Sequence, residues 1–168
     1  MVTPDTLLRT LVALPLTALL GVSACTSNPE TTPMDELTDF ATRYAAAWSG
    51  QDPARLASFH VETGSLTVNA GAPSVGRAAI IETARGFMTE FPDMVVKLDR
   101  VAREDGHVVF HWIWTGTNTG PGGTGRSVRI TESEEWTLGA DGLIAESKGH
   151  YDEAEYQRQV QGGAPPAA

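Results

Sequence analysis

The sequence predicts an α+β fold in which helices come first and an antiparallel sheet follows. In two segments between residues 34 and 91, apolar residues recur every three or four positions, which is the period of a helix. From Val95 onward they alternate with a period of two, which is the period of a strand. Short turn sequences separate the alternating segments, as in neighbouring antiparallel strands. We therefore expect the helices to be segregated to one side of the sheet.

The first helix is predicted over Met34–Ser49, where an apolar stripe occupies one face. The stripe consists of Leu37, Phe40, Ala41, Tyr44, Ala45 and Trp48. Gly50 is a suitable residue to end this helix. Asp52 can cap a short second helix that runs from Pro53 to about Phe59.

A short strand is predicted over Ser65–Asn69, and the loop Gly71–Gly76 follows it. The third helix is predicted over Arg77–Phe91, because apolar residues again recur at helical spacing. Pro92 ends it, since the residue before a proline is disfavoured in the helical conformation.

Four strands and a last helix are predicted in the second half of the chain. The strands are Val95–Arg103, His107–Thr117, Ser127–Leu138 and a closing strand from Gly142 to Tyr151, and the helix is Glu153–Val160. Asp105-Gly106 is a typical hairpin turn between the first two of these strands. The loop Gly120–Gly125 reads GPGGTG, lacks lysine and joins two strands, so it does not resemble a phosphate-binding loop.

The closing strand places charged side chains on alternate positions. Alternate residues of a strand share a face, so Ile144, Glu146, Lys148, His150 and Asp152 point one way. Such a face suits either the lining of a pocket with a polar floor or a solvated surface.

The preceding strand carries two acidic residues in an apolar row. Glu132 and Glu134 share a face with Trp136, and buried acids without partners are costly. If the hairpin pairs Trp136 with Ile144, these acids and the charged face of the closing strand gather around one site. A shift of one residue in the register would turn that charged face away. The alternative is that the face is partly solvated.

Composition excludes several classes of function. The net charge is −9, from 12 basic and 21 acidic residues, which argues against binding nucleic acid through a basic patch. The sequence has no spaced set of His, Cys and Asp typical of a metal site, and no Ser or Cys nucleophile motif. We therefore expect no metal and no cofactor. His60 and His107 are expected in exposed loops.

The amino terminus has the pattern of a secretory signal. An apolar run, Leu11–Leu20, is followed by Val22-Ser23-Ala24-Cys25, which resembles the lipobox of bacterial lipoproteins. The resemblance implies that cleavage before Cys25 leaves a lipidated cysteine, which anchors the protein at the extracytoplasmic face of the bacterial cell membrane. The alternatives are an ordinary secretory signal or an uncleaved anchor.

The resulting division of the chain has four parts. We expect a signal peptide over residues 1–24, a polar tether over 25–33, a folded domain over 34–160 and a disordered tail over 161–168. Cys25 is the sole cysteine, so an intrachain disulfide is excluded.

Five short motifs, in this order, resemble the SnoaL-like branch of the nuclear transport factor 2-like superfamily. They are YAAAW at residues 44–48, GRAAI at 76–80, FPD at 91–93, GTNTG at 116–120, and GLIAE at 142–146 with Tyr151-Asp152. The resemblance implies a cone: a curved, mostly antiparallel sheet wrapped around three amino-terminal helices, with an apolar pocket inside. Relatives with this fold include polyketide cyclases and ketosteroid isomerase, so the fold alone does not name a reaction.

The resemblance also implies a site. Asp152 occupies the position of the general acid/base that is proposed for SnoaL-like cyclases, and an apolar pocket would raise its pKa. The alternative is that Asp152 caps the last helix. His111 is either a second catalytic base in the pocket or a satisfied core histidine. Asn118 departs from the family, whose corresponding loop often carries His. The pocket is expected to be lined by Tyr44, Trp48, Glu132, Glu134, Glu146, Lys148 and His150.

Two functions remain open. The first is a tethered module that binds a small apolar ligand in its cone. The second is a polyketide cyclase- or isomerase-like enzyme with Asp152 as general acid/base. A third option is that the open face of the sheet is an interface with a second copy, as the resemblance implies, or with another partner. Trp112 and Trp114 would suit that use if they do not pack against the helices.

Overall fold

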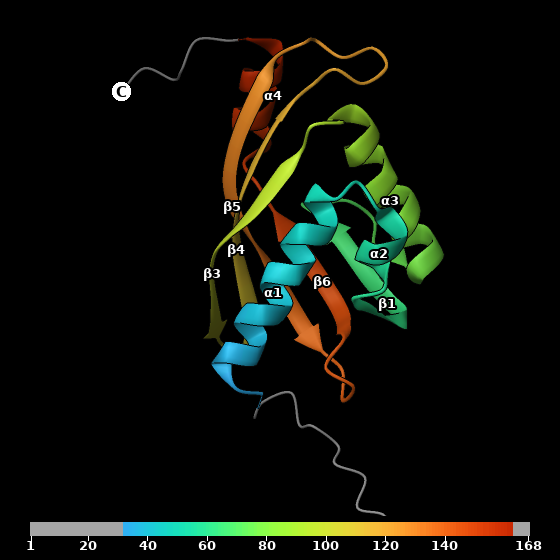
Figure 1. Ribbon diagram of the computed structural model, residues 1–168, viewed down its shortest axis with the longest axis vertical. Helices are drawn as coiled ribbons and strands as arrows, with labels where there is room; N and C mark the ends of the chain where they lie inside the picture. Colours follow the sequence, from blue (N-terminus) through green and yellow to red (C-terminus); the bar gives the residue numbers. More distant parts are fainter. Residues whose placement is uncertain (1–31, 163–168) are drawn as a thin grey trace, which may run out of the picture.

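The structure is a computed structural model that describes residues 32–162, and within this range it contains four helices and six strands (Figure 1). The helices are α1 (Met34–Ser49), α2 (Pro53–Ala57), α3 (Arg77–Glu90) and α4 (Glu153–Gln161). The strands are β1 (His60–Val68), β2 (Ser74–Val75), β3 (Val95–Glu104), β4 (His107–Thr117), β5 (Ser127–Leu138) and β6 (Ile144–His150). The predicted α+β order of elements is confirmed.

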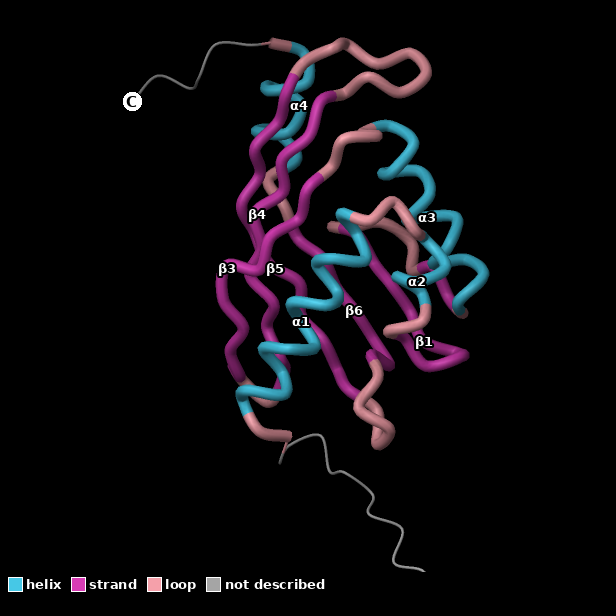
Figure 2. Tube along the Cα trace, viewed as in Figure 1, coloured by secondary structure: helices cyan, strands magenta, loops and turns pink. Residues whose placement is uncertain are grey.

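The strands form one curved, mixed sheet with the order β2-β1-β6-β5-β4-β3 (Figure 2). Neighbouring strands are antiparallel except for β1 and β6, which are parallel. The first long strand of the chain therefore pairs with the last. β1 begins at His60, five residues before the predicted start at Ser65, because its first residue already pairs with Ile144 of β6.

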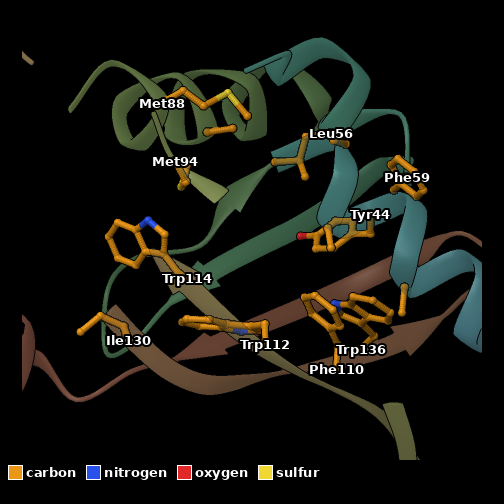
Figure 3. Packing of buried hydrophobic residues seen from close by; sticks show 14 of the residues in the cluster. Tyr44, Leu56, Phe59, Met88, Met94, Phe110, Trp112, Trp114, Ile130 and Trp136 are labelled. Atoms are coloured by element: carbon orange, nitrogen blue, oxygen red, sulfur yellow. The ribbon is translucent and has the colours of Figure 1, made fainter. Parts of the chain in front are cut away.

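Helices α1, α2 and α3 lie on one face of the sheet (Figure 1). α1 packs along β3, α2 packs against α3, and α3 packs against β1. α4 packs against β5 at one end of the molecule, where the ring of Tyr156 stacks on Trp114 with centroids 5.8 Å apart. The core lies between the helices and the inner face of the sheet (Figure 3).

The β5–β6 hairpin contains a bulge that sets which residues of β6 face inward. Leu138 pairs with Ile144 and Thr137 pairs with Glu146, so Ala145 is an extra residue on β6. Trp136 consequently pairs with Ser147, and the predicted pairing of Trp136 with Ile144 is wrong. A bulge reverses the alternation of side chains beyond it.

The expectations for the two ends of the chain lie outside the described residues. They concern the signal peptide over 1–24, lipidation at Cys25, most of the tether and the tail beyond residue 162. Among the helices within residues 32–162, none has the length and hydropathy needed to cross a membrane.

Candidate functional site

A cavity of about 80 Å³ lies between the helices and the inner face of the sheet. Six of the residues that line it are aromatic: Trp48 of α1, Phe87 of α3, Phe110, Trp112 and Trp114 of β4, and Tyr151, which follows β6. Apolar residues make up most of the remaining lining: Leu66, Val68, Met94, Val96 and Gly149. The cavity is therefore an aromatic chamber built from every layer of the fold.

Among the described residues that line the cavity, Glu134 of β5 is the one acidic residue, and no basic residue is present. Only 5% of its surface is exposed. Three neutral groups donate hydrogen bonds to its Oε1 atom. Tyr44 Oη and Trp136 Nε1 each lie 2.8 Å away, and Ser147 Oγ makes a third, short contact. Within residues 32–162, no hydrogen bond reaches Oε2, so the second carboxyl oxygen stays available to a molecule in the cavity.

Burial raises the pKa values of two hydrogen-bonded groups, the carboxyl group of Glu134 and the hydroxyl group of Tyr44. Removal from water raises the pKa of Glu134 above its ordinary value, and the hydrogen bonds from Ser147, Trp136 and Tyr44 oppose that rise. The pKa of the Tyr44 hydroxyl is raised well above its ordinary value, first by burial and then by the charge of Glu134. Tyr44 therefore stays a neutral hydrogen-bond donor, and burial favours the neutral form of the Glu134 carboxyl group.

Local sequence patterns explain how these groups meet. Strand alternation turns Glu134 inward on β5, between the buried Ile130 and Trp136. Helical spacing places Tyr44 and Trp48 on the same face of α1, which covers the sheet. Figure 3 shows the Tyr44 ring above the rings of Phe110 and Trp136, which stack with centroids 5.0 Å apart.

The bulge in β6 completes the arrangement. It turns Ser147 inward, where its side chain is fully buried against Glu134. It also places Gly149 opposite Glu134. A Cβ atom at Gly149 would lie 3.9 Å from Cγ of Glu134, so the absence of a side chain there leaves room beside the carboxyl group.

Of the residues expected in the pocket, Trp48 and Glu134 line the cavity, and Tyr44 lies directly behind Glu134 as a hydrogen-bond donor. Glu132 shares the inward direction of Glu134 but lies in a shallow surface hollow beyond the end of the cavity, together with His150 and Asp152.

The expectation that Asp152 faces the interior is wrong. Tyr151 turns toward the cavity, so the next residue points outward and is exposed. Its carboxylate caps α4 by accepting a hydrogen bond from the backbone N–H of Glu155 at 2.9 Å. The capping alternative is therefore observed, whereas a catalytic role for Asp152 stays a prediction.

Glu146, Lys148 and His150 lie on the outer face of β6, so their expected place in the pocket is also wrong. The bulge at Ala145 is the physical reason, because it moves these residues to the opposite face from Ser147 and Gly149. Glu146 and Lys148 form an ion pair of 3.0 Å in which both side chains are nearly half exposed.

His111 also lies outside the cavity. Strand β4 turns Phe110, Trp112 and Trp114 inward, so His111 faces the other side of the sheet. There its Nε2 atom lies 3.6 Å from Oε1 of Glu104. The two tryptophans thus pack beneath the helices and are not available to a partner on the outer face.

His60 is a buried residue that sequence reasoning placed in an exposed loop. It is fully buried at the start of β1, and neither ring nitrogen makes a hydrogen bond within the described part of the chain. Burial, together with a smaller effect of the charge of Arg77, lowers its pKa to about 4. The signal that could have located it is its position directly after the apolar Phe59.

Metal binding has no support from the arrangement of side chains. Between residues 32 and 162, no group of three or more His, Cys, Asp or Glu is placed to hold a metal ion. The chamber instead suits an organic molecule, with one carboxyl group for polar contact and aromatic rings for the rest.

Comparisons with known proteins agree with this architecture. Residues 38–160 match the family of SnoaL-like polyketide cyclases. No protein among those with curated functions matches the chain.

Three solved structures illustrate the likeness in fold. A putative SnoaL-like polyketide cyclase from Jannaschia sp. CCS1 is 20% identical, with 80% of this chain and 97% of that chain covered and a TM-score of 0.67. A hypothetical protein with a ketosteroid isomerase-like fold from Catenulispora acidiphila, in complex with trimethylamine, is 18% identical, with 73% and 92% covered and a TM-score of 0.65. A putative hydroxylase from Streptomyces galilaeus is 20% identical, with 81% and 87% covered and a TM-score of 0.65.

Proposed function

The chain belongs to the SnoaL-like polyketide cyclase family, and on this premise we propose that its aromatic cavity binds a small, largely apolar organic molecule whose polar group meets Glu134. The observation that carries the proposal is the arrangement around Glu134. Three donors hold one oxygen of a buried carboxyl group, and the other oxygen is left to the cavity. Such a site combines apolar burial with one orienting polar contact, as small-molecule sites do.

The size of the cavity favours a small ligand. Its volume is about 80 Å³. This is well below the roughly 300–1,000 Å³ that is usual for pockets that hold drug-sized molecules. A substrate with several fused rings would require the helices to move away from the sheet. The trimethylamine bound to the Catenulispora acidiphila protein is of the size that we propose here.

Binding is tested by filling the cavity at Gly149. The variant Gly149→Val adds methyl groups beside Glu134 at a position where a Cβ atom makes only ordinary contacts. We expect it to fold and to lose the quenching of tryptophan fluorescence by small apolar ligands, since three tryptophans line the cavity. The matched control is Ser133→Val, on the outer face of β5. Equal quenching in both variants would reject the proposal.

A second candidate function is general acid/base catalysis by Glu134. It is favoured by the raised pKa of a carboxyl group that lines an apolar cavity. In the simplest step, the carboxylate removes a proton from the α-carbon of a β,γ-unsaturated ketone to give a dienolate. The resulting carboxylic acid returns the proton to the γ-carbon, and the double bond moves into conjugation with the carbonyl group. This isomerisation needs no other reactant.

Catalysis is tested by hydrogen exchange in deuterated water. Small cyclic ketones are incubated with the protein, and the loss of their α-proton signals is followed by NMR. We expect Glu134→Gln to abolish exchange and Asp152→Asn to leave it unchanged. Loss of exchange in Asp152→Asn, with exchange retained in Glu134→Gln, would instead support Asp152 as the general acid/base, as the resemblance to SnoaL-like cyclases implies.

The cellular location is proposed from the sequence alone. The lipobox-like segment supports a mature protein that begins at Cys25 and is held at the extracytoplasmic face of the membrane. Intact-mass analysis of the membrane fraction tests this, and a retained segment 1–24 or a free thiol would reject it. Self-association into a homodimer through the outer face of the sheet is tested by analytical ultracentrifugation of residues 32–162.

A further inference from the structure

We infer that the cavity recognises a small organic cation, an ammonium group that carries methyl or other short alkyl substituents, between its aromatic rings and the carboxyl group of Glu134. The inference rests on the proposed binding function and names the chemical class of the ligand. It follows from the charges, ring surfaces and rim of the cavity.

Glu134 has no positively charged partner in the lining of the cavity within the described residues. Its three hydrogen-bond donors are two hydroxyl groups and an indole, all of them neutral. No lysine, arginine or histidine lines the cavity within the described residues. A buried carboxylate without a positive partner is costly, so a cation in the cavity would supply the missing charge.

The aromatic rings of the cavity differ in how much of their surface other rings cover. One face of Phe110 is covered by Trp136, and one face of Trp114 is covered by Tyr156. Trp112 makes no ring–ring contact with another aromatic residue among residues 32–162, and only 9% of it is exposed. Figure 3 shows its indole lying flat along the sheet, with its broad face toward the helices. The face of an indole is the strongest of the aromatic sites for a cation.

The chemistry of the cavity wall selects the kind of cation. The cavity wall offers aromatic and aliphatic groups and one carboxyl group, and it lacks the ring of oxygen ligands that Mg²⁺ or Ca²⁺ requires. Alkyl groups on nitrogen spread the positive charge over an apolar surface, which such a wall can contact without a loss of hydrogen bonds. The wall therefore suits an alkylated ammonium better than a metal ion or a primary amine.

The rim of the cavity carries acidic side chains, so its charge is negative, like that of Glu134 when ionised. Tyr151 belongs both to the cavity and to two shallow surface hollows beside it. These hollows carry the carboxylates of Glu132, Asp152 and Glu153. With a net charge of −9 on the whole chain, the field at this rim attracts cations and repels anions.

The test compares two probes of similar shape and different charge, tetramethylammonium and tert-butyl alcohol. Dissociation constants are obtained for the full chain at pH 8 from tryptophan fluorescence and isothermal titration calorimetry. We expect tetramethylammonium to bind about tenfold or more tightly than the neutral alcohol. Equal affinity, or tighter binding of the alcohol, would overturn the inference.

Substitution of the carboxyl group sharpens the comparison. In Glu134→Gln the amide oxygen can still accept the bonds from Tyr44, Trp136 and Ser147, while the charge is lost. We expect the preference for the cation to disappear and the affinity for the alcohol to change less than about threefold. The matched control is Glu135→Gln, the adjacent exposed acid on the outer face, which should keep the preference.

A second variant covers the case in which Glu134→Gln fails to fold. Trp112→Leu keeps an apolar side chain and removes the ring face, so the cation should lose affinity while the alcohol keeps it. If the alcohol binds and tetramethylammonium does not, the inference of a cationic ligand is rejected, while the proposed binding of a small organic molecule is retained. If neither probe binds and Gly149→Val changes no ligand response, both proposals fail.

Discussion

The two faces of the β5–β6 hairpin carry similar residues in opposite environments. On the inner face, Glu134 is buried and receives three hydrogen bonds from neutral donors. On the outer face, Glu146 pairs with Lys148 at 3.0 Å in contact with water. The pKa of Glu134 is raised by burial, whereas the outer pair is held in a solvated setting where ion pairs contribute little.

The acidity of a carboxyl group in this hairpin therefore depends on its burial and hydrogen-bond partners, and not on how many charged residues its strand carries. Strand β6 carries Glu146 and Lys148 on alternate positions, yet the bulge at Ala145 turns both side chains to water. Substitutions of inner groups should therefore have larger effects than substitutions of outer groups.

The largest effect is expected for Glu134→Ala, which leaves three buried donors without an acceptor. Each unsatisfied donor costs about 1–3 kcal/mol, so the free energy of unfolding should fall by about 3 kcal/mol or more. Urea denaturation measures it. Glu135→Ala, on the outer face, should change stability by less than about 0.5 kcal/mol. Similar losses in both variants would contradict the distinction between the faces.

A second effect concerns pH and the buried His60. Its folded pKa of about 4 lies below its ordinary value of 6.5, so its stabilising contribution is present above pH 6.5 and is lost as the pH falls toward 4. The difference in unfolding free energy between wild type and His60→Leu should fall by about 3 kcal/mol across this range.

Glu134 should show the opposite slope. Because its folded pKa is raised above the ordinary 4.5, its contribution is greatest below that pH and is lost as the pH rises through the folded pKa. Wild type should therefore lose stability relative to Glu134→Gln as the pH rises from 4. Parallel curves for these two proteins would show that the carboxyl group is not buried.

A smaller effect is expected at Asp152. Loss of the helix cap in Asp152→Ala should cost about 1 kcal/mol, whereas Asn caps nearly as well, so Asp152→Asn should be nearly neutral. Thermal unfolding measures both. A change in ligand affinity for Asp152→Asn, with the fold intact, would return this residue to the functional site.

The smallest effect is expected at the outer ion pair. Lys148→Ala removes the partner of Glu146 on a solvated face and should change stability by less than about 1 kcal/mol, decreasing with added salt. Urea denaturation at two ionic strengths checks it. A loss as large as that in Glu134→Ala would show that the outer face is covered in solution.

The sequence predicted most of the fold because periodicity is a local property. Helix α1 and strands β4 and β5 have the predicted bounds. In α1 the apolar residues repeat over several helical turns, and in β4 and β5 they alternate along most of the strand. β1 begins at His60 because of its pairing with β6, about 80 residues away, which no local pattern reveals.

The site was predicted less completely for two physical reasons. Both faces of β4 carry apolar residues, so the choice between the face of His111 and that of Trp112 depends on where the helices pack. The inward face of β6 depends on one extra residue, Ala145, and a register shift of one reverses every side chain beyond it. Glu134 was expected in the pocket because its own strand alternates without interruption.

The parallel pairing of β1 with β6 has a consequence for the order of assembly. β6 lies between β1 and β5, so the last of the six described strands to be synthesised lies inside the sheet and not at its edge. Until residues 144–150 are present, the β1–β2 ribbon has no strand to join it to the β3–β5 meander. Long-range pairing of this kind slows folding. The nascent chain can form the meander early, but the two parts of the sheet join only after residues 144–150 have been synthesised.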